Sequence, residues 1–232
     1  MVTTPHPAAV VRPVAAAVAV ACAASAALVL LLVAVHCRPL MAFDSALSNG
    51  LHRAAVGAPG WTRVSRLLTD RLWDPWTMRA GLAVTVGWLV RRGERLLGFW
   101  VAATSLAGTA LQQGLKAVVD RPRPVWPDPV ASAHYSAFPS GHALSVTVAG
   151  GLALWLLHRH GVRRAGQVTA AVAVGVSMLG VGFTRVHLGV HWPSDVAGGW
   201  LLGGAVAAGS VAAHAAYERR RGGTGRGEAA GS

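Results

Sequence analysis

The sequence predicts an all-α protein that crosses a membrane about six times. Hydrophobic residues make up 53% of the 232 residues and charged residues only 13%, with a mean hydropathy of +0.45. This composition is too apolar for an ordinary soluble domain of this length. The apolar residues gather in six long runs, and arginines gather in the short segments between them. These observations together predict a polytopic helical membrane protein.

The first apolar run extends from Val14 to Val35. At about 1.5 Å per residue it is long enough to cross a hydrocarbon core of about 30 Å. A cleaved signal peptide has a shorter apolar core, so we expect a retained membrane anchor. Cys22 lies in the middle of this run and Cys37 just beyond it, and the chain has no other cysteine. The sequence therefore predicts no disulfide framework.

Five further apolar runs are predicted to form transmembrane helices. The first of these five is the weakest prediction, because Asp74, Pro75 and Arg79 crowd its start. The paired glycines inside the later runs are typical of transmembrane helices that pack closely. The five runs cover about Leu72–Val90, Leu96–Leu115, Ala143–Leu157, Ala165–Phe183 and Val196–Ala216.

The runs define one six-helix domain over residues 14–217, preceded by a cytoplasmic N-terminus, residues 1–13. The Arg- and Gly-rich composition of residues 218–232 predicts a disordered basic tail. Part of the long 37–71 segment is predicted to be an amphipathic helix in the membrane interface. Its apolar positions are Trp61, Val64, Leu68 and Leu72, opposite Arg63, Arg66 and Asp70.

The arginines predict the orientation in the membrane. The N-terminus, the 91–95 and 158–164 loops and the tail share one side and hold eleven arginines in short segments. The positive-inside rule places that side in the cytoplasm. The loops at 116–142 and 184–195 then lie together on the outer side. The 37–71 segment is an exception, because it is also outside and holds five arginines, but long loops count less in this rule.

The formal net charge of +12 is explained mainly by arginines that set this topology and that contact anionic lipids. We therefore expect the lipid bilayer as the partner of the basic segments, and not a nucleic acid.

The first of three polar clusters lies at the end of the third apolar run. Lys116 is the only lysine in the chain, against twenty arginines, and Arg123-Pro124 follows it within Arg-Pro-Arg-Pro. The prolines predict an extended, semi-rigid segment. A fixed guanidinium can bind phosphate oxygens with two hydrogen bonds, and lysine adds a compact charge. Taken alone, these cations could equally extend towards the membrane surface.

The second cluster, Pro139-Ser140-Gly141-His142, precedes the fourth run. Ser140 is expected at the N-cap of a helix, and Gly141 lets backbone N–H groups approach a ligand. The free N–H groups of a helix N-terminus form an anion site, into which His142 would point. The alternative is an ordinary Ser-Gly turn with a capping histidine.

The third cluster runs from Thr184 to Asp195 and contains Arg185, His187 and His191. Pro193 suits the first turn of the last helix, which brings Asp195 close to His191. A carboxylate that holds one imidazole nitrogen leaves the other free to attack. A structural His–Asp bond and a metal site are the alternatives. A metal site with His187, His191 and Asp195 would need one continuous helix, because these residues are four apart. Gly189 and Pro193 make such a helix unfavourable.

Taken together, the three clusters resemble the signature motifs of the type 2 phosphatidic acid phosphatase (PAP2) superfamily. The resemblance covers Lys116 to Asp195, and the six-helix layout extends it over most of the chain. It implies that His191 is a nucleophile that forms a phosphohistidine, that Asp195 orients it and that His142 protonates the leaving oxygen. It also implies phosphate binding by Lys116, Arg123, Ser140, Gly141 and Arg185. Thr184 stands where the family usually has serine.

This resemblance predicts a lipid phosphatase that uses neither a metal nor another cofactor. The expected substrate is a phosphomonoester or diphosphate of a membrane lipid, of the phosphatidate or polyprenyl diphosphate type. A vanadate-dependent haloperoxidase is one alternative, because it uses nearly the same anion pocket. A non-enzymatic lipid-binding or transport protein is the other, although it would not need two histidines, Asp195 and Lys116 on one side.

Overall fold

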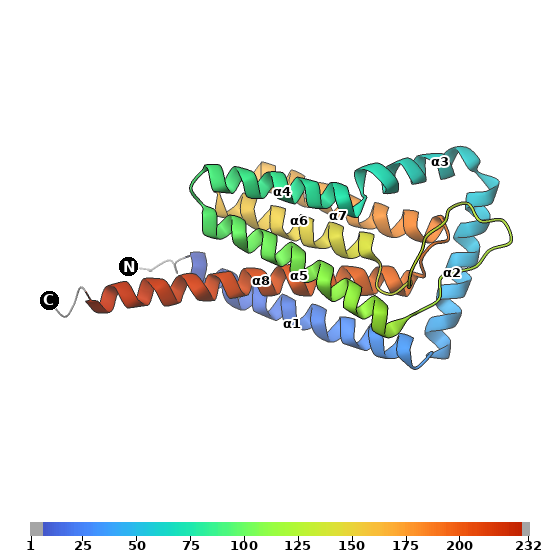
Figure 1. Cartoon of the computed structure of the whole chain (residues 1–232), viewed down its shortest axis with the longest axis horizontal. Helices are drawn as coiled ribbons and strands as arrows, with labels where there is room; N and C mark the ends of the chain where they lie inside the picture. The colour runs from blue at the N-terminus through green and yellow to red at the C-terminus, as the bar shows by residue number, and fades with distance from the viewer. Residues whose placement is uncertain (1–6, 229–232) are drawn as a thin grey trace.

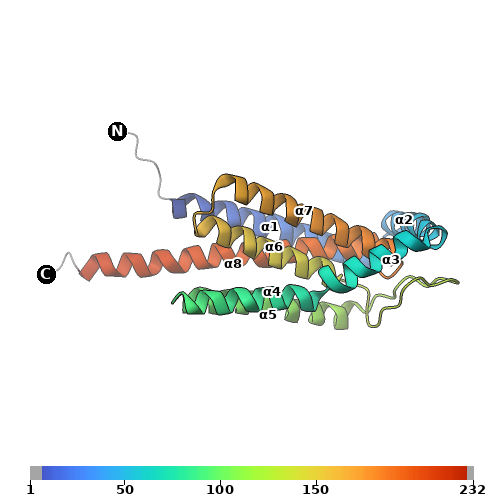
Figure 2. The ribbon, with the colours of Figure 1, turned by 90° about the horizontal axis from the view of Figure 1, so that it is seen from above.

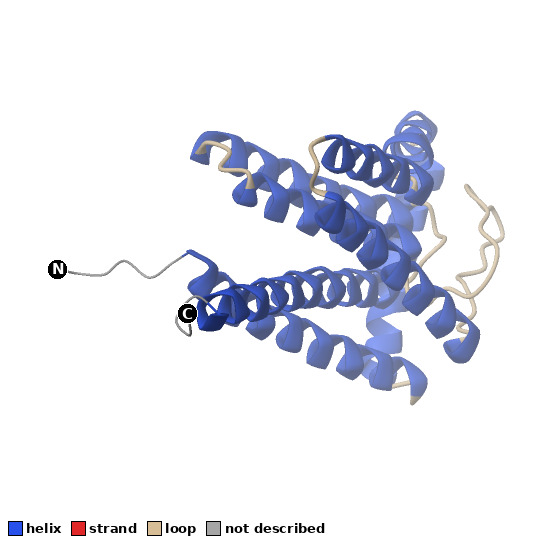
Figure 3. Cartoon of the chain, turned by 60° about the vertical axis from the view of Figure 1, so that its left-hand side comes forward, coloured by secondary structure: helices blue, strands red, loops and turns tan. Residues whose placement is uncertain are grey.

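The structure is a computed structural model that describes residues 7–228, and every regular element in that range is a helix (Figure 3). The all-α fold class predicted from the sequence is thereby confirmed. The helices are α1 (Pro7–Ala34), α2 (Arg38–Gly57), α3 (Pro59–Leu67), a π-helical turn η1 (Leu68–Leu72), α4 (Pro75–Arg91), α5 (Arg95–Val119), α6 (Gly141–Arg159), α7 (Arg164–His187) and α8 (Pro193–Glu228).

The long helices α1 and α4 to α8, six among the described residues, run lengthwise through the molecule (Figure 1). The helices α2 and α3 lie at one end of this bundle, and so does the long loop between α5 and α6 (Figures 1 and 2). The start of α1, the end of α8 and the short loops α4–α5 and α6–α7 lie at the opposite end. The segments that hold the three polar clusters and those that hold the eleven arginines are therefore at opposite ends.

The helix α6 is the centre of the bundle, because it packs against α4, α5, α7 and α8. Its Leu144, Val148 and Leu152 join Leu89 of α4 and Val101 of α5 in one apolar core. A second core lies next to the site and contains Trp73, Ala143, Val146, Val181, Val186 and Val196. Both cores include residues of α6, so its first turn has a fixed position relative to its neighbours.

Four of the described helices, α1, α6, α7 and α8, are long and apolar enough to cross a membrane. The six predicted runs coincide with six long helices, but α4 and α5 do not meet this measure. The helix α4 has 17 residues, about 25 Å, which is shorter than a typical hydrocarbon core. The helix α5 has 25 residues, but Gln112, Gln113 and Lys116 make its second half polar.

The segment before α4 is more helical than the sequence suggested. The helix α2 buries a polar stripe, Asp44, Ser48 and His52, while its apolar Phe43 and Leu47 are exposed. The helix α3 is the predicted amphipathic helix, and it buries Thr62 and Ser65 while its apolar positions Trp61 and Val64 face outward. Such inverted amphipathic helices suit a position between the protein and lipid.

The helix α8 continues to Glu228, whereas the sequence predicted a disordered tail from residue 218. Glu218 supports this extension, because it lies 2.7 Å from the guanidinium of Arg159 at the end of α6. Arg221 also stacks over Tyr217, one helical turn away. Residues 229–232 and the first six residues lie outside the described part of the chain.

Candidate active site

The three polar clusters meet in one open cavity of about 280 Å³, at the end of the bundle where α2 and α3 lie. Six predicted site residues line it: Lys116, Arg123, Gly141, His142, Arg185 and His191. The other two, Ser140 and Asp195, are fully buried behind its wall. Clusters that are almost eighty residues apart in the sequence therefore form a single site.

The first cluster is fixed by the loop between α5 and α6. Lys116 lies in the last turn of α5, which Asp120 ends with a left-handed backbone conformation. The chain from Arg121 to Pro124 belongs to no helix, as the prolines predicted. The Lys116 ammonium group donates a hydrogen bond to the carbonyl of Ser136 in the same loop. This contact holds its charge at the cavity wall.

Backbone carbonyls fix the guanidinium of Arg123. Its Nε donates to the Tyr135 carbonyl at 2.8 Å and Nη2 to the His134 carbonyl at 3.2 Å, while Nη1 donates to the Val190 carbonyl. The same Nη1 lies 3.2 Å from Nε2 of His191. Arg123 therefore faces His191, the histidine that the resemblance implies as the nucleophile.

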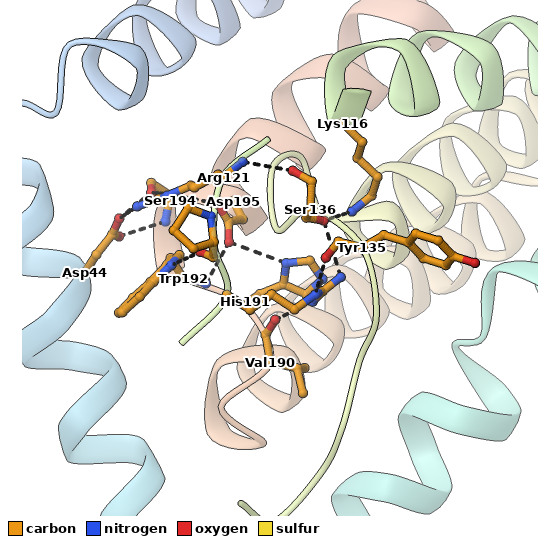
Figure 4. A network of polar contacts seen from close by, with 12 residues as sticks. Asp44, Lys116, Arg121, Tyr135, Ser136, Val190, His191, Trp192, Ser194 and Asp195 are labelled. Carbon is orange, nitrogen blue, oxygen red and sulfur yellow. Dashed lines mark hydrogen bonds and ion pairs between the residues drawn. The ribbon is translucent and has the colours of Figure 1, made fainter. Parts of the chain in front are cut away.

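These contacts determine which ring nitrogen of His191 carries the proton. A guanidinium only donates, so Nε2 must accept and be unprotonated. The proton is then on Nδ1, which lies 3.4 Å from Oδ2 of Asp195. Oδ2 also accepts a hydrogen bond of 2.8 Å from the Trp192 amide, so the carboxylate has a fixed direction (Figure 4).

Burial, together with the charges of Arg185, Arg123 and Lys116, lowers the pKa of His191 well below its usual value. His191 is only 2% exposed and lies in the short segment before α8. The imidazole is therefore neutral at physiological pH. A neutral ring with a free Nε2 can act as a nucleophile.

In the second cluster, Ser140 occupies the N-cap of α6, as predicted, but its hydroxyl makes no capping hydrogen bond. Instead the backbone connects two helices, because the Ser140 amide donates to the Asp195 carbonyl at 3.0 Å. Gly141 begins α6, and a Cβ there would lie 3.1 Å from Nε2 of Gln112. His142 follows in the first turn of α6 and lines the cavity.

In the third cluster, Arg185 lies near the end of α7 and is 7% exposed. Its Nη1 donates to the hydroxyl of Thr69 at 3.4 Å, in the π-helical turn η1. The Thr184 hydroxyl does not line the cavity, because it donates to the Val181 carbonyl within α7.

His187 does not share the cavity with His191. Gly189, at a positive φ of 68°, turns the chain after α7, and α8 begins at Pro193, as the sequence predicted. The ring of His187 instead stacks on Phe183, with 5.1 Å between centroids. Among the described residues, no three His, Cys, Asp or Glu side chains are grouped closely enough to hold a metal ion.

Sequence reasoning missed a buried arginine behind the site. Arg121 Nη1 lies 2.6 Å from Asp195 Oδ1, and its Nη2 lies 2.7 Å from Oδ2 of Asp44 on α2 (Figure 4). Ser194 completes this cluster through its amide and hydroxyl. The one signal in the sequence was Arg121 itself, the first arginine of Arg-Pro-Arg-Pro. A buried arginine needs an acidic partner, and the chain has few acidic residues to choose from.

The cavity rim was also missed, and it comes mainly from α4, α5 and the α5–α6 loop. Trp76 on α4 lines the cavity and is 74% exposed, so the cavity reaches the outer surface of the bundle. The other rim side chains are Asp74, Arg79, Gln112, Gln113, His134 and Tyr135.

Comparison with known proteins gives the same family as the motifs. The family model described as "PAP2 superfamily" matches residues 97–219. A crystal structure of a transmembrane PAP2-type phosphatidylglycerolphosphate phosphatase from Bacillus subtilis superposes with a TM-score of 0.67 and 25% identity. That match covers 79% of this chain and 90% of the other chain.

Two curated proteins are similar over shorter segments. An undecaprenyl-diphosphatase of Sulfolobus acidocaldarius is 40% identical over 67 residues, 29% of this chain and 28% of that protein. Phosphatidylglycerophosphatase B of Bacillus subtilis is 33% identical over 94 residues, 40% of this chain and 46% of that protein. The chain therefore spans less than half the length of either curated relative.

Proposed function

Because the chain belongs to the PAP2 superfamily, we propose that it is a phosphatase acting on a membrane lipid phosphate or diphosphate. The geometry around His191 is the main support for this proposal. A neutral histidine, His191, presents an unprotonated Nε2 to Arg123 in a cavity that Lys116 and Arg185 also line. A nucleophile among three fixed cations suits attack on a phosphoryl group.

The first step of the proposed reaction forms a phosphohistidine. Nε2 of His191 attacks phosphorus, and the bond between phosphorus and the lipid oxygen breaks. The leaving oxygen takes a proton from His142, which a bound phosphate would favour in its protonated form. The cations Lys116, Arg123 and Arg185 oppose the negative charge on the three equatorial oxygens.

In the second step, water hydrolyses the phosphohistidine. His142, now neutral, accepts a proton from the attacking water, and the bond between phosphorus and Nε2 breaks. Inorganic phosphate leaves and His191 is again neutral. Asp195 keeps the proton on Nδ1 throughout, so Nε2 is always the reacting atom. No step needs a metal ion.

The exposed rim supports a lipid as substrate. Trp76 is part of the cavity wall and of the outer surface of α4, and Leu72, at the end of the turn η1 before α4, is 54% exposed. A lipid could therefore place its phosphate in the cavity while its chains stay outside the bundle. The similar proteins are named for a polyprenyl diphosphate and for a phosphatidylglycerol phosphate, and we propose a substrate of this class. We also propose that the site faces the outside of the cell.

Phosphate release from purified, detergent-solubilised protein tests this function. The panel should include phosphatidate, phosphatidylglycerol phosphate and a polyprenyl diphosphate, with His191→Ala as the inactive control. We expect release from at least one of these lipids by the wild-type protein. Halide oxidation by peroxide that depends on vanadate, without phosphate release, would indicate a haloperoxidase. Lipid binding without either activity would indicate a transport or lipid-binding protein.

A further inference from the structure

A buried arginine shared by two carboxylates lies directly behind the proposed nucleophile. Arg121, in the loop that follows α5, contacts Asp195 at 2.6 Å and Asp44 at 2.7 Å. The three side chains are 8%, 0% and 1% exposed, respectively. They come from three parts of the chain, and Figure 4 shows them on the side of His191 that faces away from Lys116.

Asp44 also holds the start of α8. Its Oδ1 accepts a hydrogen bond of 2.9 Å from the Ser194 amide, and its Oδ2 accepts one from the Ser194 hydroxyl. The Ser194 amide is one of the free N–H groups at the N-terminus of α8, where a carboxylate is favourable. Asp195 is the next residue, so Asp44 restrains the backbone that carries it.

The charges explain why a second carboxylate is needed. If Arg121 contacted Asp195 alone, the pair would be neutral and would give little help to a positive imidazole. Attack through Nε2 makes the ring positive, because Nδ1 keeps its proton. With Asp44 included, the cluster has a net charge of −1 beside Nδ1. The cations Lys116, Arg123 and Arg185 all lie on the cavity side, and their charges disfavour a positive imidazole ring.

We propose that Asp44 is a positioning residue for the reaction, acting through Arg121 and Ser194. It fixes the direction of the Asp195 carboxylate and keeps the buried cluster negatively charged beside His191. This inference rests on the proposed function. The alternative is a purely structural link between α2 and α8 that has no effect on the chemistry.

The test compares Asp44→Asn with Ser48→Ala. Ser48 lies one turn further along α2, is equally buried and carries no charge, so it is a matched control. By analogy with side chains that orient metal ligands, we expect Asp44→Asn to lower kcat by about 10- to 100-fold, with KM within about threefold. Rapid-quench labelling should show slower phosphoenzyme formation. Ser48→Ala should change kcat by less than about threefold.

Two further variants separate charge from structure. Asp44→Glu and the double variant Asp44→Asn/Arg121→Met both leave a net charge of −1, whereas Asp44→Asn alone leaves zero. We expect both to have a higher kcat than Asp44→Asn. A purely structural link predicts the opposite for the double variant, because it loses two buried partners. If Asp44→Asn does not fold, both charge-matched variants should still have kcat within about 100-fold of wild type, and a larger loss in either one would overturn the proposal.

The outcomes are distinct for the two proposals. An active wild-type protein together with an unimpaired Asp44→Asn variant would overturn the positioning role alone. A double variant less active than Asp44→Asn would also overturn it. No phosphate release by the wild-type protein would overturn the proposed function, and the positioning role with it.

Discussion

At the scale of residues, replacing His191 and replacing His142 should reduce activity in different ways. His191→Ala should abolish turnover and any phosphoenzyme, because no nucleophile remains. His142→Ala should reduce kcat most with a lipid alkoxide leaving group and least with an aryl phosphate, which departs with less proton donation. We expect losses of about 10²- to 10⁴-fold for the alkoxide. Steady-state rates on both substrates measure this, and equal losses would argue against His142 as the proton donor.

The buried His191 should make the fold sensitive to acid. Its pKa in the folded protein lies well below the usual 6.5, so below pH 6.5 the unfolded chain binds a proton that the folded chain does not. The free energy of unfolding is therefore unaffected by this residue above pH 6.5, and it decreases as the pH falls towards the pKa of His191 in the folded protein. Between pH 7 and 5.5 the loss should be about 1 kcal/mol.

Thermal unfolding in detergent at these two pH values checks this expectation. His191→Gln cannot titrate, so its stability should change less over this range than that of the wild-type protein. An equal change in both proteins would assign the acid sensitivity to other groups.

A metal requirement would contradict the proposed roles of Lys116, Arg123 and Arg185. Activity should survive EDTA, because these side chains supply the catalytic charge. Vanadate should inhibit, since it mimics the trigonal-bipyramidal transition state at His191. His187→Ala should keep a substantial part of the activity, because His187 stacks on Phe183 outside the cavity. Inactivation by EDTA with recovery on adding a divalent ion would rule out phosphohistidine chemistry without a metal.

The sequence predicted the polar residues of the three clusters, but not the buried partners of Asp195 or the rim of the cavity. Lys116, Arg123, His142 and Arg185 stand out as polar groups beside apolar runs. Asp44 has no such signal, because it lies more than seventy residues before its partner Arg121 and within a segment read mainly as a loop. Only the fold brings such side chains together.

At the scale of elements, close contact between α8 and α6 positions the site. A Cβ on Gly199 of α8 would lie 2.6 Å from the Ser140 carbonyl oxygen, a contact that real side chains do not make. Gly199→Ala should therefore displace α8 from the first turn of α6, where His142 lies. We expect a loss of about 1–3 kcal/mol in stability and a clear fall in kcat.

Gly175→Ala on α7 is the control for this prediction, because a Cβ there meets no atom within 4 Å. It should leave activity unchanged and leave stability unchanged or slightly higher, by up to about 1 kcal/mol. Melting temperatures in detergent and phosphate release compare the two variants. A Gly199→Ala variant as stable and active as Gly175→Ala would show that α8 has room to move.

The apolar runs predicted six long helices because burial in lipid selects long apolar segments. The paired glycines predicted close packing, which Gly150 confirms, since a Cβ there would lie 2.5 Å from Val174 of α7. The helix α2 was missed because its buried face is polar and its apolar face points outward, the reverse of a soluble helix. The end of α8 was missed because composition does not reveal the contact of Glu218 with Arg159.

At the scale of the whole molecule, the loop between α5 and α6, which helps to line the cavity, and the arginine-rich loops lie at opposite ends of the bundle (Figure 1). This arrangement makes the orientation in the membrane testable with two positions. Ser132 lies in the α5–α6 loop near the cavity, and Gly161 lies in the α6–α7 loop at the other end. Both are exposed in the structure, so a cysteine at either position can be labelled when the reagent reaches it.

If the positive-inside rule holds, the cavity faces the outside of the cell. In intact cells, a membrane-impermeant thiol reagent should then label Ser132→Cys and not Gly161→Cys, whereas permeabilised cells should show both. Cys37 lies at the cavity end, between α1 and α2, and should be replaced first, because it could react from the same side as Ser132. Labelling of Gly161→Cys alone in intact cells would place the cavity in the cytoplasm, and the substrate would then have to be a lipid phosphate of the inner leaflet.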